Sequence, residues 1–311
     1  MDSLHFHLTV IAIVFAVLAL AGLVFYLWRQ SRREIRPFDL SLEENEVEGW
    51  TWRFHRSGRG PDLVLIHGIG ADLFCWRQII PLLNPDYRVW AVDLPGFGGS
   101  TKKPDATYGL DDQVTRLHEF LDEVGVSRAH LVGNSMGGNI ALWLAHKFPK
   151  QVASVTVIGP ATSPKLVPLS LEKWLWLSGP LSWMVTKSSM EWIHRRTVSR
   201  SEVVDPSRVD ATYRTYRRNP DAIRSFLRAT EAIRDSRLPG DLRDIKCPVQ
   251  VLWGSRDKLV SKKVIDDLKA TLPKAPSHVH IGGGHHLQED EPQWVHQKIV
   301  EFSLGNQDET P

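Results

Sequence analysis

Two kinds of hydrophobic pattern occur along the chain: one long unbroken segment near its start and a series of shorter runs after it. Residues 8–28 are apolar except for Thr9 and Tyr26, and they carry no formal charge. A helix of this length rises about 1.5 Å per residue and spans roughly 30 Å, which is the thickness of the hydrocarbon core of a bilayer. This segment therefore predicts a transmembrane helix.

The residues that flank this apolar segment predict its orientation. Four arginines follow it between residues 29 and 36 against a single glutamate, whereas residues 1–7 contain no lysine or arginine. The positive-inside rule then places the rest of the chain on the cytoplasmic side. A cleaved secretory signal is the alternative, but it needs a basic leader, a shorter apolar stretch and small residues at the cleavage site. We therefore predict an uncleaved anchor with a basic juxtamembrane segment over residues 1–36.

After residue 37, short apolar runs alternate with segments of helical periodicity. Strands are predicted at residues 63–66, 87–94, 129–132, 152–158, 249–253 and 278–281. Apolar residues at 114, 117, 121 and 124 lie on one helix face, and Gly125 follows as a stop signal. Strands that alternate with helices predict βαβ units and a mostly parallel sheet. The predicted α/β core covers residues 37–159 and 241–311.

Residues 160–240 contain no strand-like run and lie between two predicted strands, so they predict a helical cap inserted into the core. The first half is rich in leucine and tryptophan, and the second half has nine arginines between residues 195 and 228. The apolar face could pack against its neighbours, line an acyl tunnel or form a lid that dips into a membrane. The basic face could be solvated or could contact anionic lipid headgroups.

Charge and cysteine content narrow the possible classes of function. With 38 basic and 36 acidic residues the net charge is +2, which does not indicate a nucleic-acid-binding protein. Cys75 and Cys247 provide no disulfide framework, and we expect Cys75 to be a buried helix residue. His278 and His280 alternate along a predicted strand, and no cysteine or H-E-x-x-H pattern joins them. We expect no metal and no cofactor.

Residues 133–138, Gly-Asn-Ser-Met-Gly-Gly, follow an apolar run and begin a helical stretch. The spacing G-x-S-x-G is typical of a nucleophile elbow, a turn so sharp that a Cβ two positions from the serine would collide with the strand or helix. Ser135 is thus the candidate nucleophile. Its hydroxyl is nearly inert at neutral pH unless a neighbouring base removes the proton.

A candidate base and acid follow in the chain order serine, aspartate, histidine, as expected for one fold class. His285 follows three glycines on a loop after a predicted strand, with His286 as the alternative base. Asp257 follows the strand at 249–253 and would orient the imidazole and stabilise its charged form. Asp241 and Asp244 lie in a charged linker, where we expect them to be solvated.

Several segments together resemble the α/β-hydrolase fold family over residues from about 50 to 304. They are His67–Gly70, Asp93–Ser100, Gly133–Gly138, Trp253–Asp257, and Gly284-His285 followed by Pro292. The resemblance implies His285 rather than His286 as the base, because of its spacing from Pro292. It also supports Asp257, because the other family position for the acid, after Ile158, holds no carboxylate.

The same resemblance implies an oxyanion hole made by the backbone N–H groups of Ile69 and Met136. His67 is then a support for the loop that contains Ile69. A serine at position 135 argues against haloalkane dehalogenases and soluble epoxide hydrolases, which place an aspartate there. An N-terminal anchor before such a domain is similar to membrane-anchored monoacylglycerol lipases of this family.

These observations predict a serine hydrolase that cleaves lipophilic carboxylic esters at a membrane through an acyl-enzyme on Ser135. The same three residues also occur in C–C bond hydrolases, cofactor-free haloperoxidases and acyltransferases of the family. A non-catalytic binding protein on this scaffold is a further alternative, although such proteins usually lose a member of the triad. The sequence does not indicate acyl length, headgroup or oligomeric state.

Overall fold

The structure is a computed structural model that describes residues 40–234 and 242–305. The predicted transmembrane helix at 8–28 and the basic segment up to residue 36 lie outside these residues, as does Asp241. Within the described part, no helix is both long enough and apolar enough to cross a membrane.

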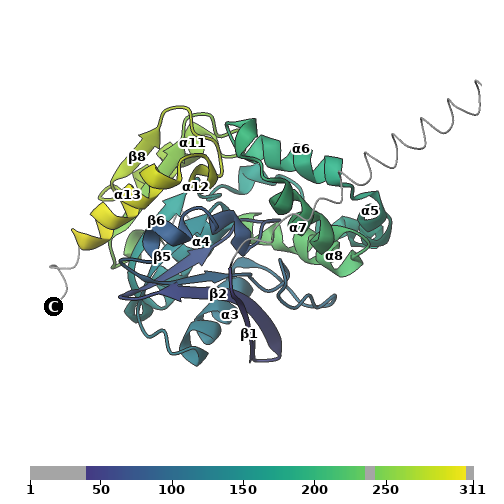
Figure 1. Cartoon of the computed structure of the whole chain (residues 1–311), viewed down its shortest axis with the longest axis horizontal. Coiled ribbons are helices and arrows are strands. Elements are labelled where there is room, and N and C mark those ends of the chain that lie inside the picture. Colours follow the sequence, from purple (N-terminus) through teal and green to yellow (C-terminus); the bar gives the residue numbers. More distant parts are fainter. Residues whose placement is uncertain (1–39, 235–241, 306–311) are drawn as a thin grey trace, which may run out of the picture. The chain divides into compact units, whose positions relative to one another are not determined.

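Eight strands form one sheet in the order β1-β2-β4-β3-β5-β6-β7-β8. The labelled strands β1, β2, β5, β6 and β8 follow one another in this order in Figure 1. The strands are β1 (Leu42–Val47), β2 (Trp50–Gly58), β3 (Asp62–Ile66), β4 (Arg88–Val92), β5 (Ala129–Asn134), β6 (Val152–Ile158), β7 (Val249–Gly254) and β8 (Ser277–His280). All neighbours from β4 to β8 are parallel, while β2 is antiparallel to both β1 and β4. The predicted mostly parallel sheet is confirmed, and its six predicted strands correspond to β3–β8.

The hairpin β1–β2 was absent from the predicted elements. Strand β1 reads Leu-Glu-Glu-Asn-Glu-Val and pairs only with β2, so it is a polar edge strand without an apolar run. Strand β2 alternates instead, because Trp50, Trp52 and Phe54 point into the core while the residues between them are less buried. This period of two is a strand signal that a search for continuous apolar runs does not detect.

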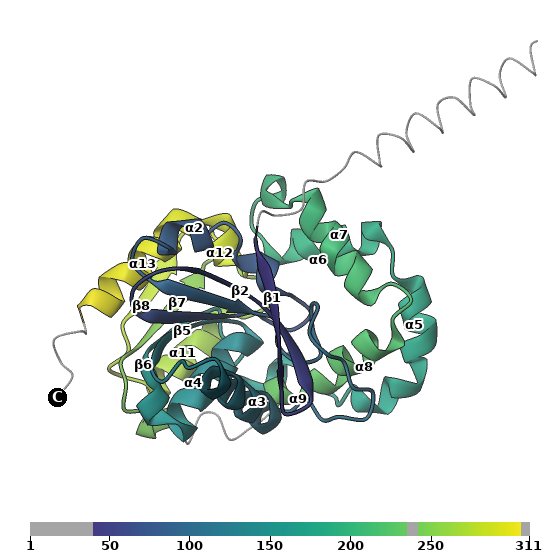
Figure 2. The ribbon, with the colours of Figure 1, turned by 60° about the horizontal axis from the view of Figure 1, so that its bottom comes forward.

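Alternate residues of the central strands pack on opposite faces of the sheet. In β3, Val64 and Ile66 belong to one core cluster and Leu63 and Leu65 to the other. The first face is covered by α3 (Leu110–Glu123), α4 (Met136–Lys147) and α11 (Lys262–Thr271). The second is covered by η1 (Leu73–Trp76), α2 (Ile80–Leu83) and α13 (Pro292–Leu304), and Figure 2 shows α2 and α13 across the sheet from α3 and α4.

Between β6 and β7, the described residues 160–234 form helices and no strand. They comprise η3 (Pro164–Leu166), η4 (Glu172–Leu177), α5 (Ser178–Met184), α6 (Lys187–Thr197), η5 (Ser201–Val203), α7 (Pro206–Tyr216), α8 (Pro220–Ala229) and α9 (Glu231–Arg234). Figure 2 shows α5 to α8 gathered on one side, apart from α3 and α4. We refer to residues 160–234 as the cap. The short helices η2 (Pro149–Gln151), η6 (Leu242–Asp244) and α12 (Leu287–Asp290) complete the core.

The exposure of side chains in the cap distinguishes between the alternatives that the sequence left open for its apolar and basic faces. Trp176, Trp183 and Trp192 are 72%, 60% and 61% exposed, so packing against neighbouring helices does not account for them. Arg208, in contrast, is buried, with 1% of its surface exposed. For this arginine the two predicted alternatives, a solvated side chain and a contact with lipid headgroups, are therefore both wrong. Its charge is stabilised by carboxylates of the core, which the sequence does not place near it.

Candidate active site

The path of the chain through the sheet creates a crevice at the carboxyl ends of β3 and β5. Strand β4, which follows β3 in the chain, lies on one side of β3 in the sheet, and the next strand, β5, lies on its other side. At such a reversal of strand order, α/β sheets bind ligands at the carboxyl ends of the strands. The loop at 67–70 follows β3, and Ser135 follows β5. The two are in close contact, since a Cβ built on Gly68 would lie 3.0 Å from the Cβ of Ser135.

Ser135 has the backbone conformation of a strained turn, with φ 55° and ψ −119°. Such a conformation in a non-glycine residue costs about 1–3 kcal/mol and persists only where its surroundings enforce it. Four backbone hydrogen bonds hold it here. The Ser135 N–H donates to Ile158 O at 3.0 Å, and Ser135 O accepts from the N–H groups of Gly138, Ala161 and Asn139 at 3.0, 3.2 and 3.4 Å.

Gly133 and Gly137 leave no space for a side chain on either side of this serine. A Cβ on Gly133 would lie 2.2 Å from Gly137 O, and a Cβ on Gly137 would lie 2.2 Å from Ile66 O. Strand β5, helix α4 and strand β3 therefore meet at backbone contact distance. The steric requirement predicted from the G-x-S-x-G spacing is present in the structure.

The candidate acid and base form a hydrogen-bonded pair. His285 Nδ1 lies 2.8 Å from Asp257 Oδ2, and the side chains are 3% and 0% exposed. The other carboxylate oxygen of Asp257 accepts from the N–H groups of Leu259 and Val260 at 2.8 and 2.9 Å. The carboxylate is thus fixed by the backbone after β7. Because Nδ1 of His285 is bonded to Asp257, Nε2 is the ring nitrogen that can interact with a further group.

Contacts with the ends of β5 and β6 bring His285 next to the serine turn. The side chain of Asn134, the residue before Ser135, donates to His285 O and Ile158 O, both at 3.0 Å. A Cβ on Gly159, which has φ 49°, would lie 2.9 Å from Asp257 Oδ2 and 3.2 Å from His285 Nδ1. The backbone after β6 therefore packs directly against the Asp257–His285 pair.

Ser135 and His285 line one cavity of about 340 Å³, which lies between the core and the cap. The core contributes the loop residues 68–71, and the cap contributes apolar side chains together with His194, Thr197, Arg208, Thr212 and Tyr216. These apolar residues are Val185, Met190, Ile193, Ile223 and Phe226. The structure thus brings together the three predicted catalytic residues at the edge of an apolar cavity.

The sequence comparison identifies the family to which this arrangement belongs. The sequence model of the alpha/beta hydrolase family matches residues 63–298. The chain belongs to the alpha/beta hydrolase family. The match runs from β3 into α13, and so it includes both the serine turn and the Asp257–His285 pair.

Individual relatives of this hydrolase differ in their reactions. It is 30% identical to the 2-hydroxy-6-oxononadienedioate/2-hydroxy-6-oxononatrienedioate hydrolase of Paraburkholderia phymatum, over 83% of this chain and 93% of that protein. It is 24% identical to the monoacylglycerol lipase ABHD6 of Bos taurus, over 91% of this chain and 86% of the lipase. A crystal structure of a bacterial membrane phospholipase A matches with a TM-score of 0.71 and 26% identity, over 99% of this chain and 100% of that one.

The predicted oxyanion donors of the hydrolase are placed on both sides of the crevice. Ile69 lies in the loop after β3, and Met136 is the first residue of α4. Within residues 40–234 and 242–305, neither backbone N–H donates to another residue. His67 braces the loop, because its Nε2 accepts from Leu94 N at 3.0 Å and its Nδ1 contacts Gly68 O at 2.8 Å. Burial lowers the pKa of His67, which keeps the ring neutral and able to accept.

His286, the alternative base, belongs to a separate buried ion-pair network. Its Nδ1 lies 3.0 Å from Glu289 Oε1, and burial lowers its pKa. Glu289 also accepts from Arg208 Nε at 3.1 Å and pairs with Arg77. Arg208 donates in turn to Asp72 at 2.8 Å. Burial opposes ionisation of Glu289, but Arg208, His286 and Arg77 outweigh it and hold the pKa of Glu289 well below its usual range.

The next residue, Asp290, connects the same two regions through backbone donors. Its Oδ2 accepts from Gly284 N at 2.7 Å, directly before His285, and from Ser199 N of the cap at 2.9 Å. Two successive carboxylates of α12 therefore link the cap to the loop that carries His285. The sequence did not indicate roles for Asn134, Glu289, Asp290 and Arg208. The available signals were that Asn134 precedes Ser135 and that Glu289 and Asp290 follow His285 within five residues.

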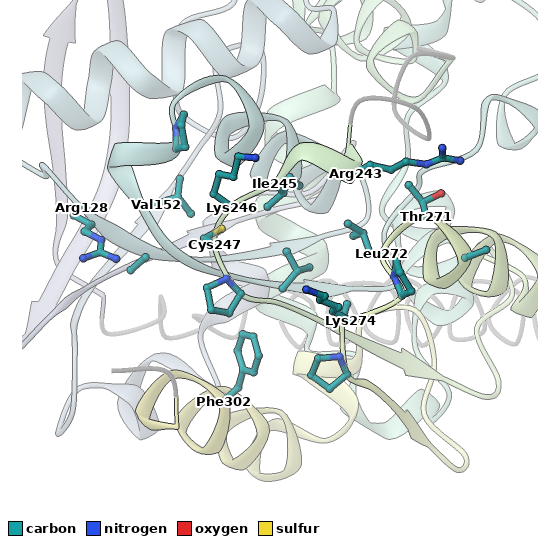
Figure 3. A pocket seen from close by; sticks show the side chains of 18 residues that line it. Arg128, Val152, Arg243, Ile245, Lys246, Cys247, Thr271, Leu272, Lys274 and Phe302 are labelled. Atoms are coloured by element: carbon teal, nitrogen blue, oxygen red, sulfur yellow. The ribbon is translucent and has the colours of Figure 1, made fainter. Parts of the chain in front are cut away.

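The remaining candidate groups do not form a second reactive centre in the described part of the chain. Burial raises the pKa of the Cys75 thiol, and it raises that of Cys247 to about 12, so both stay protonated. A larger cavity of about 1040 Å³ lies at the amino ends of β6 and β7, next to Cys247 (Figure 3). No histidine, serine or carboxylate lines it. Over residues 40–234 and 242–305, no group of three or more metal-ligating side chains is assembled.

Replacing Gly137 with alanine tests the steric requirement at the serine turn. We expect Gly137→Ala to lower the free energy of unfolding by about 3 kcal/mol or to prevent folding, because the new methyl group would meet Ile66 O. Gly179→Ala in α5 is the matched control, since no atom lies within 4 Å of its Cβ position. That change should stabilise the protein by about 0.5 kcal/mol in urea unfolding. Equal stability of both variants would contradict the steric argument.

Replacing Glu289 with glutamine tests the buried network through its pH dependence. We expect Glu289→Gln to lower the free energy of unfolding by about 3 kcal/mol near neutral pH, since Arg208 and Arg77 lose a buried counter-charge. A carboxyl whose folded pKa is depressed stabilises the fold above its unfolded pKa of about 4.3, and this stabilisation is lost as the pH falls further.

The difference between wild type and variant should therefore be constant above about pH 5 and shrink in more acidic solution. Glu191→Gln, which removes an exposed pair with Arg195, should change stability by less than about 0.5 kcal/mol. A Glu289→Gln effect as small as that of the control would show that the buried network is not stabilising.

Proposed function

We propose that this protein is a serine hydrolase that cleaves lipophilic carboxylic esters of the acylglycerol type at a membrane surface. The observation that carries the proposal is the shared apolar cavity of Ser135 and His285, with His285 bonded to Asp257 at 2.8 Å. A nucleophile, a base and a group that orients the base are the minimum set for acyl transfer through a serine ester.

The proposed reaction begins with the attack of Ser135 Oγ on the ester carbonyl carbon while His285 Nε2 takes the hydroxyl proton. The N–H groups of Ile69 and Met136 stabilise the negative oxygen that develops, and Asp257 stabilises the imidazolium. The alcohol leaves with the proton of His285, and an acyl ester remains on Ser135. Water then attacks this ester, His285 takes its proton and returns it to Ser135, and the carboxylic acid is released.

The charge of the cavity favours an uncharged substrate. Burial lowers the pKa of His194 to about 3, and burial also lowers the pKa of His286, so neither ring is a cation near neutral pH. The guanidinium of Arg208 is already paired with Asp72 and Glu289. A dianion such as the dienedioate named for the Paraburkholderia relative would require unpaired cations. We therefore favour ester hydrolysis over C–C bond hydrolysis.

The surface of the cap supports a lipid substrate. Seven large apolar side chains between residues 169 and 193 are more than 40% exposed: Leu169, Trp174, Trp176, Trp183, Met184, Trp192 and Ile193. Ile193 also lines the cavity, so the apolar surface continues to the cavity mouth. The cap carries 13 basic and 7 acidic residues, and tryptophan with arginine is typical of surfaces that meet anionic bilayers.

The proposal includes membrane attachment through the apolar segment at 8–28, with the hydrolase domain on the cytoplasmic side. The charge asymmetry around that segment and the names of two relatives, a membrane phospholipase A and a monoacylglycerol lipase, support it.

Substitution of Ser135 tests the reaction. Ser135→Ala should lower turnover of monoacylglycerols and of nitrophenyl butyrate by roughly 10⁴-fold or more, because no other described group replaces the nucleophile. Ser261→Ala, an exposed serine whose side chain caps no helix N–H, should leave turnover unchanged. Undiminished turnover by Ser135→Ala would exclude this serine, and wild-type activity confined to short soluble esters would exclude the lipid substrate.

Substitution of exposed tryptophans tests the contact with lipid. We expect the full-length double variant Trp176→Ser, Trp183→Ser to hydrolyse a monoacylglycerol presented in anionic vesicles roughly tenfold more slowly, because the aromatic side chains anchor the cap at the interface. Hydrolysis of soluble nitrophenyl butyrate should not change. Leu42→Ser, which alters an exposed apolar residue outside the cap, is the control. Equal rates of double variant and wild type on vesicles would contradict a lipid-docking cap.

A further inference from the structure

The apolar cavity contains two buried polar atoms without a hydrogen-bond partner in the described part of the chain. They are Tyr216 Oη and Arg208 Nη2, and both residues line the cavity. Tyr216 is 5% exposed and Arg208 is 1% exposed. Leaving a buried polar group unpaired costs about 1–3 kcal/mol, so two such groups in one cavity call for a functional explanation.

Other polar side chains of the cavity are already paired. His194 Nε2 contacts Thr212 Oγ1 at 3.0 Å, and Thr197 Oγ1 donates to His194 O at 2.8 Å. His286 is paired with Glu289 at 3.0 Å. These contacts use one ring nitrogen each of His194 and His286, whereas the Tyr216 hydroxyl and the remaining Arg208 amino group are buried with no hydrogen-bond partner in the described residues.

The hydroxyl of Tyr216 is held close to the loop that supplies an oxyanion donor. It lies 4.0 Å from the position of a Cβ on Gly70, the residue after Ile69. The ring packs edge-on against Phe226 with a centroid distance of 6.3 Å. A substrate group bound to this hydroxyl would therefore lie beside the loop that carries Ile69.

The charges around these two donors define the kind of acceptor they suit. Arg208 is bonded to the carboxylates of Asp72 and Glu289, so its positive charge is compensated. Burial, with Asp72 and Asp93 nearby, raises the pKa of Tyr216, which keeps its hydroxyl neutral. An anionic ligand would add a third negative charge in a buried place. An uncharged oxygen can accept a hydrogen bond from either donor without this cost.

We propose that Tyr216 and Arg208 recognise a free hydroxyl group of the substrate, so that the preferred lipid ester bears an uncharged hydroxyl within the cavity. This inference rests on the proposed ester hydrolysis. The hydroxyl could belong to the alcohol part, as in a partial glyceride, or to a hydroxylated acyl chain. Either source presents the same chemistry to Tyr216 and Arg208.

The variant Tyr216→Phe removes the hydroxyl and keeps the ring contact with Phe226. Three esters of equal chain length separate the sources: monodecanoylglycerol, the ethyl ester of a hydroxydecanoic acid, and ethyl decanoate. We expect kcat/KM of the variant to fall roughly tenfold for one of the two hydroxylated esters and less than about twofold for ethyl decanoate, which is the scale of one neutral hydrogen bond. Tyr213→Phe, on the same helix but outside the cavity lining, should affect none of them.

Equal losses on all three esters, or no loss on either hydroxylated ester, would overturn the inference. So would a wild-type preference for a decanoyl ester with a carboxylate in its alcohol part. Inactivity of the wild type on every ester would instead reject the proposed function.

Binding can then be measured without turnover by thermal shift with the non-hydrolysable decyl ether of glycerol. A larger shift for wild type than for Tyr216→Phe supports recognition of the hydroxyl. When the three esters assign the hydroxyl to the alcohol part, equal shifts contradict it.

Discussion

The absence of space at Gly133 and Gly137 is the constraint on which the site depends. Backbone atoms of β5, α4 and β3 approach so closely there that a Cβ would come within 2.2 Å of a carbonyl oxygen. The chain must reverse within one residue, and Ser135 takes the strained conformation that results. This geometry projects the serine from the carboxyl end of β5 into the crevice beside β3, next to the loop that contains Gly68. The loops after β7 and β8 add Asp257 and His285 at the same edge of the sheet.

The cap and the histidine loop share their supports. Glu289 binds Arg208 of the cap, and Asp290 binds the backbone of the cap and the N–H of Gly284. A displacement of the cap would therefore disturb the same carboxylates that position the residues around His285. In physical terms, closure of the apolar cavity and alignment of the base depend on one buried polar network. Buried charges of this kind are strongly destabilising when one partner is lost, which favours a single arrangement of cap and core.

The sequence predicted the parts of the molecule that are set by local rules. Apolar runs identified β3 to β7, and the glycine spacing identified the turn at Ser135, because sterics and burial act within a few residues. The edge strand β1 was missed because most of its side chains are polar, so that its pairing with β2 leaves no apolar pattern in the sequence. Arg208 and Glu289 were missed because they are 81 residues apart and meet only in the folded chain. Their charges resemble those of surface residues until tertiary packing buries them.

The central claim is that Ser135 is a nucleophile activated by the His285–Asp257 pair, and covalent trapping tests it most directly. The folded full-length protein is treated with a fluorophosphonate, and the adduct is located by peptide mass spectrometry. One phosphonyl group is expected, on Ser135. The reaction should be about a hundredfold slower in the His285→Ala variant, because the base that activates the serine is lost. A folded protein that forms no adduct, or one that carries it on another residue, would contradict the account.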